Sequence, residues 1–140
     1  MQIRTAVDTD HEDIVHLLGG LLEDRLAPAE AYVKPLAQLL TGDRGTVLVA
    51  EENGELYGLI TISFVLALRY TGDYAQIEEL IVDPRARGKK LGVGLVKAAI
   101  EAARSADCHE IGLYAREHNQ PFYERLGFEY AGPELRLKLV

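Results

Sequence analysis

The sequence predicts a mixed α+β fold, with helices on both faces of a twisted, mostly antiparallel sheet of six to seven strands. Segments with strand and helix periodicity follow one another in the order β-αα-βββ-α-β-α-β. The dipeptide Asn53-Gly54 separates two apolar, strand-like runs and is typical of a tight hairpin. A length of 140 residues suits one unit with a buried core. We therefore expect a single domain over residues 1–140.

The first half of the chain is expected to contain an edge strand, two helices and the hairpin. Asp8-Thr9-Asp10 offers caps for the first helix, in which leucines and isoleucine recur at helical spacing. The second helix follows Ala27-Pro28-Ala29, and Pro35 indicates either its first turn or a kink. The strand segments of this half are residues 3–7, 46–51 and 56–68.

The second half is expected to continue with a strand, a long amphipathic helix, a short strand, a short helix and two final strands. Gly132-Pro133 separates the last two strands, because proline interrupts strand pairing. The strand segments are residues 74–82, 111–114, 128–130 and 135–140, and the helices span about 91–105 and 119–126.

Composition excludes several functional classes. A net charge of −7 argues against a nucleic-acid surface, which would need a basic face. The longest apolar stretch, residues 59–68, is too short to cross a bilayer. Cys108 is the only cysteine, so an internal disulfide is excluded and we expect a cytoplasmic protein. The four histidines are scattered, so we predict no metal site.

The most informative segment lies between residues 80 and 95. An apolar strand stops at Asp83-Pro84, a basic loop containing Gly88 follows, and an amphipathic helix then begins with Gly92 and Gly94 in its first turns. Small residues at a helix start let a ligand approach bare backbone N–H groups, where the helix dipole favours an anion. The spacing fits neither a P-loop nor a dinucleotide fingerprint. Taken alone, the segment indicates either an ordinary strand–loop–helix connection or a phosphate site of another kind.

A second motif follows at Pro121-Phe122-Tyr123-Glu124-Arg125-Leu126-Gly127-Phe128. Phe122 and Leu126 share one face of a short helix, and Gly127 can end that helix in a left-handed conformation. By this pattern alone, Tyr123 is a packing residue with a solvated hydroxyl.

Together the two motifs resemble those of the GNAT acetyltransferases over roughly residues 45 to 130. Residues Arg87 to Gly92 resemble the acyl-CoA pyrophosphate loop, written [RQ]-x-x-G-x-[GA], with Lys90 where the middle glycine is usual. The downstream segment resembles the F-Y-x-x-x-G-F signature of the same family. The resemblance implies acetyl-CoA as cosubstrate. The residues it assigns to acetyl-CoA binding are Leu80, Ile81, Val82, Arg87, Gly88, Lys89, Lys90, Leu91, Gly92, Val93, Gly94, Asn119 and Phe122.

The same resemblance suggests catalytic residues. Tyr123 is the expected general acid for the CoA thiolate. Gln76 stands where some members carry a catalytic glutamate, and glutamine cannot accept a proton. Glu79, slightly favoured over Glu78, is the expected general base or amine-binding carboxylate, acting directly or through water. A water relay without a side-chain base is the alternative. A bulge in this strand would change which of the two glutamates faces the site.

The function implied is acetyl-CoA-dependent N-acetylation of a small-molecule primary amine, by direct attack in a ternary complex. The run Ile77-Glu78-Glu79-Leu80 is similar to the glucosamine-phosphate and aminoalkylphosphonate acetyltransferases. Two alternatives stay open: a non-catalytic acyl-CoA sensor, suggested by Gln76 and Lys90, and a protein N-acetyltransferase. A homodimer through the C-terminal strands is also expected. The candidate acceptor-binding residues are Glu23, Asp24, Tyr32, Arg69, Tyr70 and Tyr74.

Overall fold

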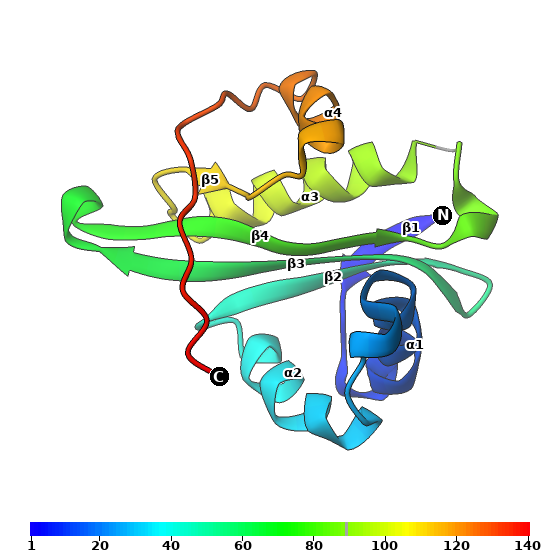
Figure 1. The fold of residues 1–140 in the computed structure, drawn as a ribbon. Coiled ribbons are helices and arrows are strands. Elements are labelled where there is room, and N and C mark those ends of the chain that lie inside the picture. Colours follow the sequence, from blue (N-terminus) through cyan, green and yellow to red (C-terminus); the bar gives the residue numbers. More distant parts are fainter. Residues whose placement is uncertain (89) are drawn as a thin grey trace.

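The computed structural model contains a five-stranded sheet in the order β1-β2-β3-β4-β5, with α1 and α2 on one face and α3 and α4 on the other (Figure 1). It describes residues 1–88 and 90–140; Lys89, one of the expected pyrophosphate-binding residues, lies outside them. The strands are β1 (Gln2–Thr5), β2 (Gly45–Glu52), β3 (Glu55–Ala67), β4 (Gly72–Val82) and β5 (Ile111–Gly112). The helices are α1 (His11–Leu22), α2 (Val33–Leu40), α3 (Leu91–Ser105) and α4 (Gln120–Glu124).

The topology leaves part of one edge of β4 without a neighbouring strand among the described residues. Strands β1 to β4 pair antiparallel in sequence order, while β5 returns parallel to β4 after the crossover through α3. β5 pairs with β4 at only two positions, Ala75 with Ile111 and Gln76 with Gly112. Beyond Gln76, the β5-facing edge of β4 therefore runs on without a strand partner among the described residues.

Two apolar cores lie on opposite faces of the sheet because strand side chains alternate. On the α1/α2 face, Val47, Val49 and Leu59 are almost completely buried against the first two helices. On the α3/α4 face, Leu95 and Val96 of α3 pack with strand residues of the alternate set. That set comprises Leu48, Ile60, Ile62 and Ile77.

Helix α3 is seated closely on the sheet at Gly58 of β3. A Cβ added at Gly58 would lie 2.8 Å from Leu95 Cδ1 and 3.1 Å from Leu91 Cδ2. The absence of a side chain at this position lets the first two turns of α3 approach the strand backbone. This contact fixes where the start of α3 stands relative to the end of β4.

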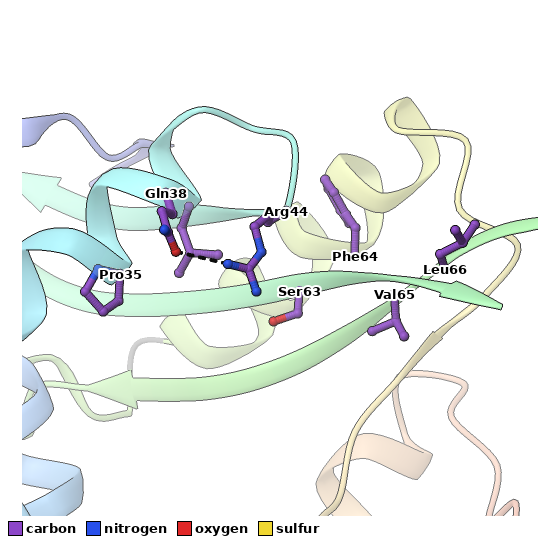
Figure 2. Close-up of a pocket in the computed structure, with 8 residues that line it drawn as sticks. Pro35, Gln38, Arg44, Ser63, Phe64, Val65 and Leu66 are labelled. Atoms are coloured by element: carbon purple, nitrogen blue, oxygen red, sulfur yellow. Dashed lines mark hydrogen bonds between the residues drawn. The ribbon is translucent and has the colours of Figure 1, made fainter.

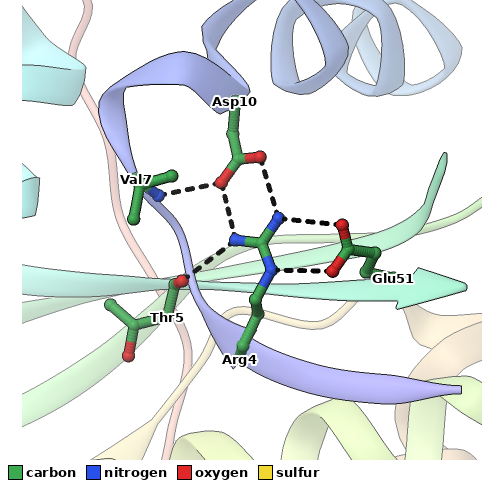
Figure 3. Close-up of polar contacts among 5 residues, drawn as sticks. All are labelled: Arg4, Thr5, Val7, Asp10 and Glu51. Atoms are coloured by element: carbon green, nitrogen blue, oxygen red, sulfur yellow. Dashed lines mark hydrogen bonds and ion pairs between the residues drawn. The ribbon is translucent and has the colours of Figure 1, made fainter. Parts of the chain in front are cut away.

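An ion-pair network ties the N-terminal strand to the entrance of α1 (Figure 3). Arg4 donates two hydrogen bonds to the Asp10 carboxylate, at 2.8 and 3.0 Å, and also pairs with Glu51 of β2. Asp10 is 6% exposed and accepts the Val7 N–H at 2.8 Å as well. The Arg4 hydrogen bonds hold the pKa of Asp10 below its ordinary value. The network thus stabilises the fold at neutral pH, and its contribution falls as acid protonates Asp10.

The structure confirms the fold class and corrects the number of strands. Residues 128–140 form no strand, although the sequence predicts strands at 128–130 and 135–140. Leu135, Leu137 and Leu139 are 92%, 85% and 89% exposed. This segment therefore has the alternating pattern of a strand, but it pairs with no strand among the described residues. A strand forms only where an edge is available to pair with it. Pro35 lies in the first turn of α2, where its missing N–H has no helical acceptor.

Candidate functional site

The loop after β4 is built on a tight turn. Asp83 accepts hydrogen bonds from the Arg85 backbone N–H, at 2.8 Å, and from the Arg85 guanidinium, at 3.1 Å. These contacts lower the pKa of Asp83, so its carboxylate stays charged and holds the turn. Ala86, 1% exposed, anchors the loop in the core of the α3/α4 face. The turn fixes the direction in which the chain leaves β4.

A cavity of about 320 Å³ lies where this loop, the end of β4, the first turn of α3 and α4 meet. Eight of the expected cofactor-binding residues line it: Val82, Arg87, Gly88, Lys90, Leu91, Gly92, Val93 and Phe122, together with Ala86. The first N–H groups of a helix have no acceptor within the helix, so those at the start of α3 can bind an anion here. The structure therefore places these eight residues, which the sequence predicted to bind acetyl-CoA, around one cavity.

Other expected cofactor-binding residues lie outside this lining. The Gly94 N–H already bonds to the Lys90 carbonyl at 3.2 Å, and a Cβ at Gly94 would lie 3.2 Å from Ile3 Cδ1. Gly94 therefore serves the packing of α3 on the sheet. Ile81 is buried on the α1/α2 face, whereas Leu80 packs on the α3/α4 face. Asn119 occupies the N-cap position of α4 without a side-chain capping bond.

Lys90 adopts the backbone conformation that a glycine would favour. Its φ and ψ are 57° and 26°, in the left-handed region, and it forms the N-cap position of α3. A side chain in this region costs about 1 kcal/mol relative to an ordinary conformation, a penalty that glycine avoids. Lys90 therefore holds a backbone conformation favoured by glycine while adding positive charge beside the cavity.

Phe122 of α4 lines the cavity, and the neighbouring Tyr123 packs against it. Phe122 lies next to Gly92, since a Cβ at Gly92 would be 3.5 Å from Phe122 Cζ. Tyr123 packs edge-to-face between Phe122 and Phe128, with ring centroids 5.0 and 5.7 Å away. Burial raises the pKa of Tyr123, so its hydroxyl remains protonated and can donate. Tyr123 is thus a packing residue of the α3/α4 face with a protonated hydroxyl, and its role as general acid stays a prediction.

The two candidate glutamates lie at a β-bulge in β4. Thr61 of β3 is opposite Glu79, whereas the next residue, Ile62, is opposite Ile77, so Glu78 is the extra residue. Glu78 is exposed, and Glu79 is half-buried on the same face as Ile81. Glu79 accepts a hydrogen bond from the Thr61 hydroxyl. Burial is the largest influence on Glu79 and raises its pKa.

The expected acceptor-binding residues separate into two groups. Tyr32 accepts the Ala27 N–H at 3.0 Å and so braces the connection between α1 and α2. Arg69, at the end of the β3–β4 hairpin, stacks over the rings of Tyr70 and Tyr74 at 4.7 and 5.1 Å. The hydroxyl of Tyr70 donates to Glu110, which joins the hairpin end to the segment before β5.

A groove that sequence reasoning missed lies between α2 and the free edge of β3 (Figure 2). Its volume is about 500 Å³, and it forms because β3 continues beyond the point where β2 begins. Arg44 lies along the groove and donates to Gln38 Oε1 at 3.0 Å. The unequal lengths of the two predicted hairpin strands are the signal that could have indicated it.

Two further classes of site are not found among the described residues. No group of histidine, cysteine, aspartate and glutamate side chains in this part of the chain could hold a metal ion. No described helix is long and apolar enough to cross a membrane.

Comparison with known proteins identifies the family. The model of the acetyltransferase (GNAT) family matches residues 12–128. The chain belongs to the GNAT family. It is 31% identical to the glucosamine 6-phosphate N-acetyltransferase of Trypanosoma brucei brucei, over 99% of this chain and 96% of that protein. Identity to the aminoalkylphosphonate N-acetyltransferase of Salmonella typhimurium is 29%, over 91% of this chain and 84% of that protein.

The fold is also shared with solved structures. A transcriptional regulator from Bacillus halodurans superposes with a TM-score of 0.88 at 30% identity, covering 99% of each chain. Membership of the GNAT family and the N-acetyltransferases among its relatives identify this protein as an acyltransferase.

The conformation of Lys90 generates a stability prediction. Lys90→Gly should raise the free energy of unfolding by about 0.5–1 kcal/mol, because glycine adopts the left-handed region without a side-chain penalty. The control is Lys97→Gly, at an exposed position inside α3, which should lower it by about 1 kcal/mol. Urea denaturation of both variants measures the difference. Equal destabilisation by the two would contradict a left-handed backbone at residue 90.

Proposed function

We propose that this GNAT protein transfers the acetyl group of acetyl-CoA to the primary amine of a small molecule, by direct attack in a ternary complex. The observation that carries the proposal is the cavity at the start of α3, where the N–H groups of its first turn and the cations Arg87 and Lys90 meet the end of β4. An acidic protein, of net charge −7, here presents a local basic loop, which suits the pyrophosphate of CoA.

The open edge of β4 suits the rest of the cosubstrate. Beyond Gln76 no described strand pairs with this edge, so its backbone groups can hydrogen-bond to an extended pantetheine arm. In this arrangement Leu80, Ile81 and Val82 contribute backbone, and Phe122 and Asn119 flank the arm from the side of α4. The thioester then lies at the β4 edge, between the two faces of the sheet.

Acid and base act from opposite faces of this edge. The amine nitrogen attacks the thioester carbonyl, and the C–S bond breaks as the C–N bond forms. Tyr123, on the α3/α4 face, gives its proton to the departing thiolate, and its raised pKa keeps that proton available. Glu79, on the α1/α2 face, takes the proton that the amine loses, directly or through water. Tyr123 regains a proton from solvent and Glu79 releases its proton to solvent, which completes the cycle.

A small amine is favoured over a protein tail by two relatives. The proteins from T. brucei brucei and S. typhimurium are named for glucosamine 6-phosphate and for aminoalkylphosphonates, and both names denote small amines that bear a phosphorus acid. The alternative of a non-catalytic sensor rests on Gln76 and Lys90, and the left-handed backbone of Lys90, which a glycine would favour, supports the enzyme over the sensor.

The proposal predicts turnover that depends on the Tyr123 hydroxyl. Wild-type protein should release CoA from acetyl-CoA with at least one member of a panel containing glucosamine 6-phosphate, 2-aminoethylphosphonate, other small amines and lysine peptides. Tyr123→Phe should lower kcat about 10²-fold or more while leaving the KM for acetyl-CoA nearly unchanged, because general acid catalysis acts on the chemical step.

The matched control is Tyr130→Phe, since Tyr130 is 70% exposed and outside the site; its kcat should equal that of the wild type. No CoA release with any amine would refute the proposed activity. Peptides that outcompete every free amine would identify a protein acetyltransferase instead. A parallel loss of kcat and acetyl-CoA affinity in Tyr123→Phe would make Tyr123 a binding or packing residue.

We also propose that the single domain formed by residues 1–140 works as a homodimer. Within this chain the segment Leu135–Val140 alternates exposed apolar residues with Arg136 and Lys138, a pattern typical of a strand with one buried face. The outer edge of β5 is the end of the described sheet. A second copy can supply the missing strand at such an edge, and each copy would then shield the other's leucines.

Sedimentation equilibrium tests this assembly. Wild-type protein should sediment as a dimer, and Leu137→Asp should be monomeric because a carboxylate cannot be buried in an apolar interface without a large penalty. Lys138→Asp, on the alternate face of the same segment, is the control that should stay dimeric. A monomeric wild type, or a dimer that Leu137→Asp leaves intact, would contradict the proposed interface.

A further inference from the structure

Thr61 is unusual among the buried polar residues of this protein. The described buried polar or charged residues are Asp10, Thr61 and Asp83, and each aspartate is paired with an arginine. Thr61 is 6% exposed in the middle of β3, between Ile60 and Ile62, which are each 1% exposed. A hydroxyl in such surroundings needs hydrogen-bond partners, because leaving it unpaired costs about 1–3 kcal/mol.

A single residue provides both partners of the Thr61 hydroxyl. Thr61 Oγ1 accepts the backbone N–H of Glu79 at 3.1 Å and donates its own proton to Glu79 Oε1. One hydroxyl therefore binds the backbone and the side chain of Glu79 together. This double contact fixes the direction in which the Glu79 carboxylate leaves the strand.

The double contact sits at the bulge of β4. The pairing of β3 with β4 shifts between Thr61 and Ile62, and the extra residue, Glu78, is exposed. Without the bulge, alternation along β4 would assign Glu79 and Ile77 to the same face. With it, Glu79 faces the α1/α2 side with Thr61, while Ile77 packs against α3. Thr61 thus contacts the residue whose orientation the bulge determines.

The contact engages one carboxylate oxygen only. Glu79 Oε1 accepts from Thr61, and Glu79 Oε2 has no hydrogen-bond partner among the residues that the structure describes. Oε2 is therefore the oxygen available to a substrate proton. A half-buried, oriented carboxylate with one oxygen held and the other free suits a general base.

We propose that Thr61 is a positioning residue for the acetyl transfer: its hydroxyl holds Glu79 Oε1 so that Oε2 can accept the proton from the acceptor amine. This inference rests on the proposed function, since it gives Glu79 the role of base. Thr61 itself touches neither the amine nor the thioester in this scheme. It acts through Glu79.

The electrostatic consequence has a definite sign. Burial raises the pKa of Glu79, the Thr61 hydrogen bond lowers it, and the neighbouring charge of Glu78 raises it. Among the described residues, Glu78 is the one ionisable group whose charge acts on Glu79. Removing the Thr61 hydroxyl takes away the one lowering contribution, so the pKa of Glu79 should rise. The base is then deprotonated only at higher pH, and the acid limb of the kcat/KM profile moves upward.

The test compares Thr61→Val, which keeps the shape and removes the hydroxyl, with Thr61→Ser, which keeps the hydroxyl. The first readout is the ¹³C NMR titration of the Glu79 side-chain carboxyl in the protein without substrate, assigned with Glu79→Gln. Thr61→Val should shift this titration upward by about one pH unit, a change consistent with the loss of one hydrogen bond to a charged group. Thr61→Ser should titrate close to the wild type.

The second readout is the pH dependence of kcat/KM with an amine that the wild type acetylates. The acid limb should move with the NMR titration in Thr61→Val and return in Thr61→Ser, which a purely structural role of Thr61 would not produce. If Thr61→Val does not fold, Thr61→Ala provides the same comparison. An unshifted Glu79 titration, or an equal shift in the serine variant, would overturn the inference. A wild type that acetylates no amine would instead refute the proposed function, because the NMR titration needs no turnover.

Discussion

The close contact between α3 and β3 at Gly58 is the constraint on which the arrangement of this site depends. Leu91 and Leu95, one turn apart, lie where a side chain at residue 58 would stand. The start of α3 is therefore held against the sheet, and the loop that leads into it has a fixed end point. The other end of the loop is fixed by Asp83 and Arg85. Leu91, Gly92 and Val93 of the first helical turn line the cavity together with Val82 and Phe122.

Strand β4 separates the two halves of the proposed chemistry. Its residues Leu80 and Val82 face α3 and α4, together with Tyr123, whereas Glu79 and Ile81 face α1 and α2. Alternation along the strand makes this division, and the bulge at Glu78 determines which of the two sets faces α1 and α2. The early end of the β4–β5 pairing at Gln76 leaves the dividing edge open. A thioester at that edge is accessible to an acid from one face and to an amine and base from the other.

The sequence was sufficient to predict features that depend on local pattern. The Asn53-Gly54 hairpin, the periodicity of α1 and α3 and the end of β4 at Asp83-Pro84 are present as expected, since each follows from short-range periodicity or turn chemistry. Most expected loop residues line one cavity, because they are contiguous and a single turn brings them together. The final strands did not form, since strand formation needs an edge that local pattern cannot supply. The partnership of Thr61 with Glu79 was not predictable either, because it joins residues 18 apart through a register shift that no local pattern specifies.

The central claim is that the first turn of α3 binds the pyrophosphate of acetyl-CoA through its backbone. Amide hydrogen exchange, followed by NMR with and without acetyl-CoA, tests it at the atoms concerned. Bound acetyl-CoA should slow exchange at the amides of Leu91, Gly92 and Val93, which lack acceptors within the helix, and leave exchange across α2 unchanged. Protection confined to the groove beside α2, or no protection anywhere at saturating acetyl-CoA, would contradict it.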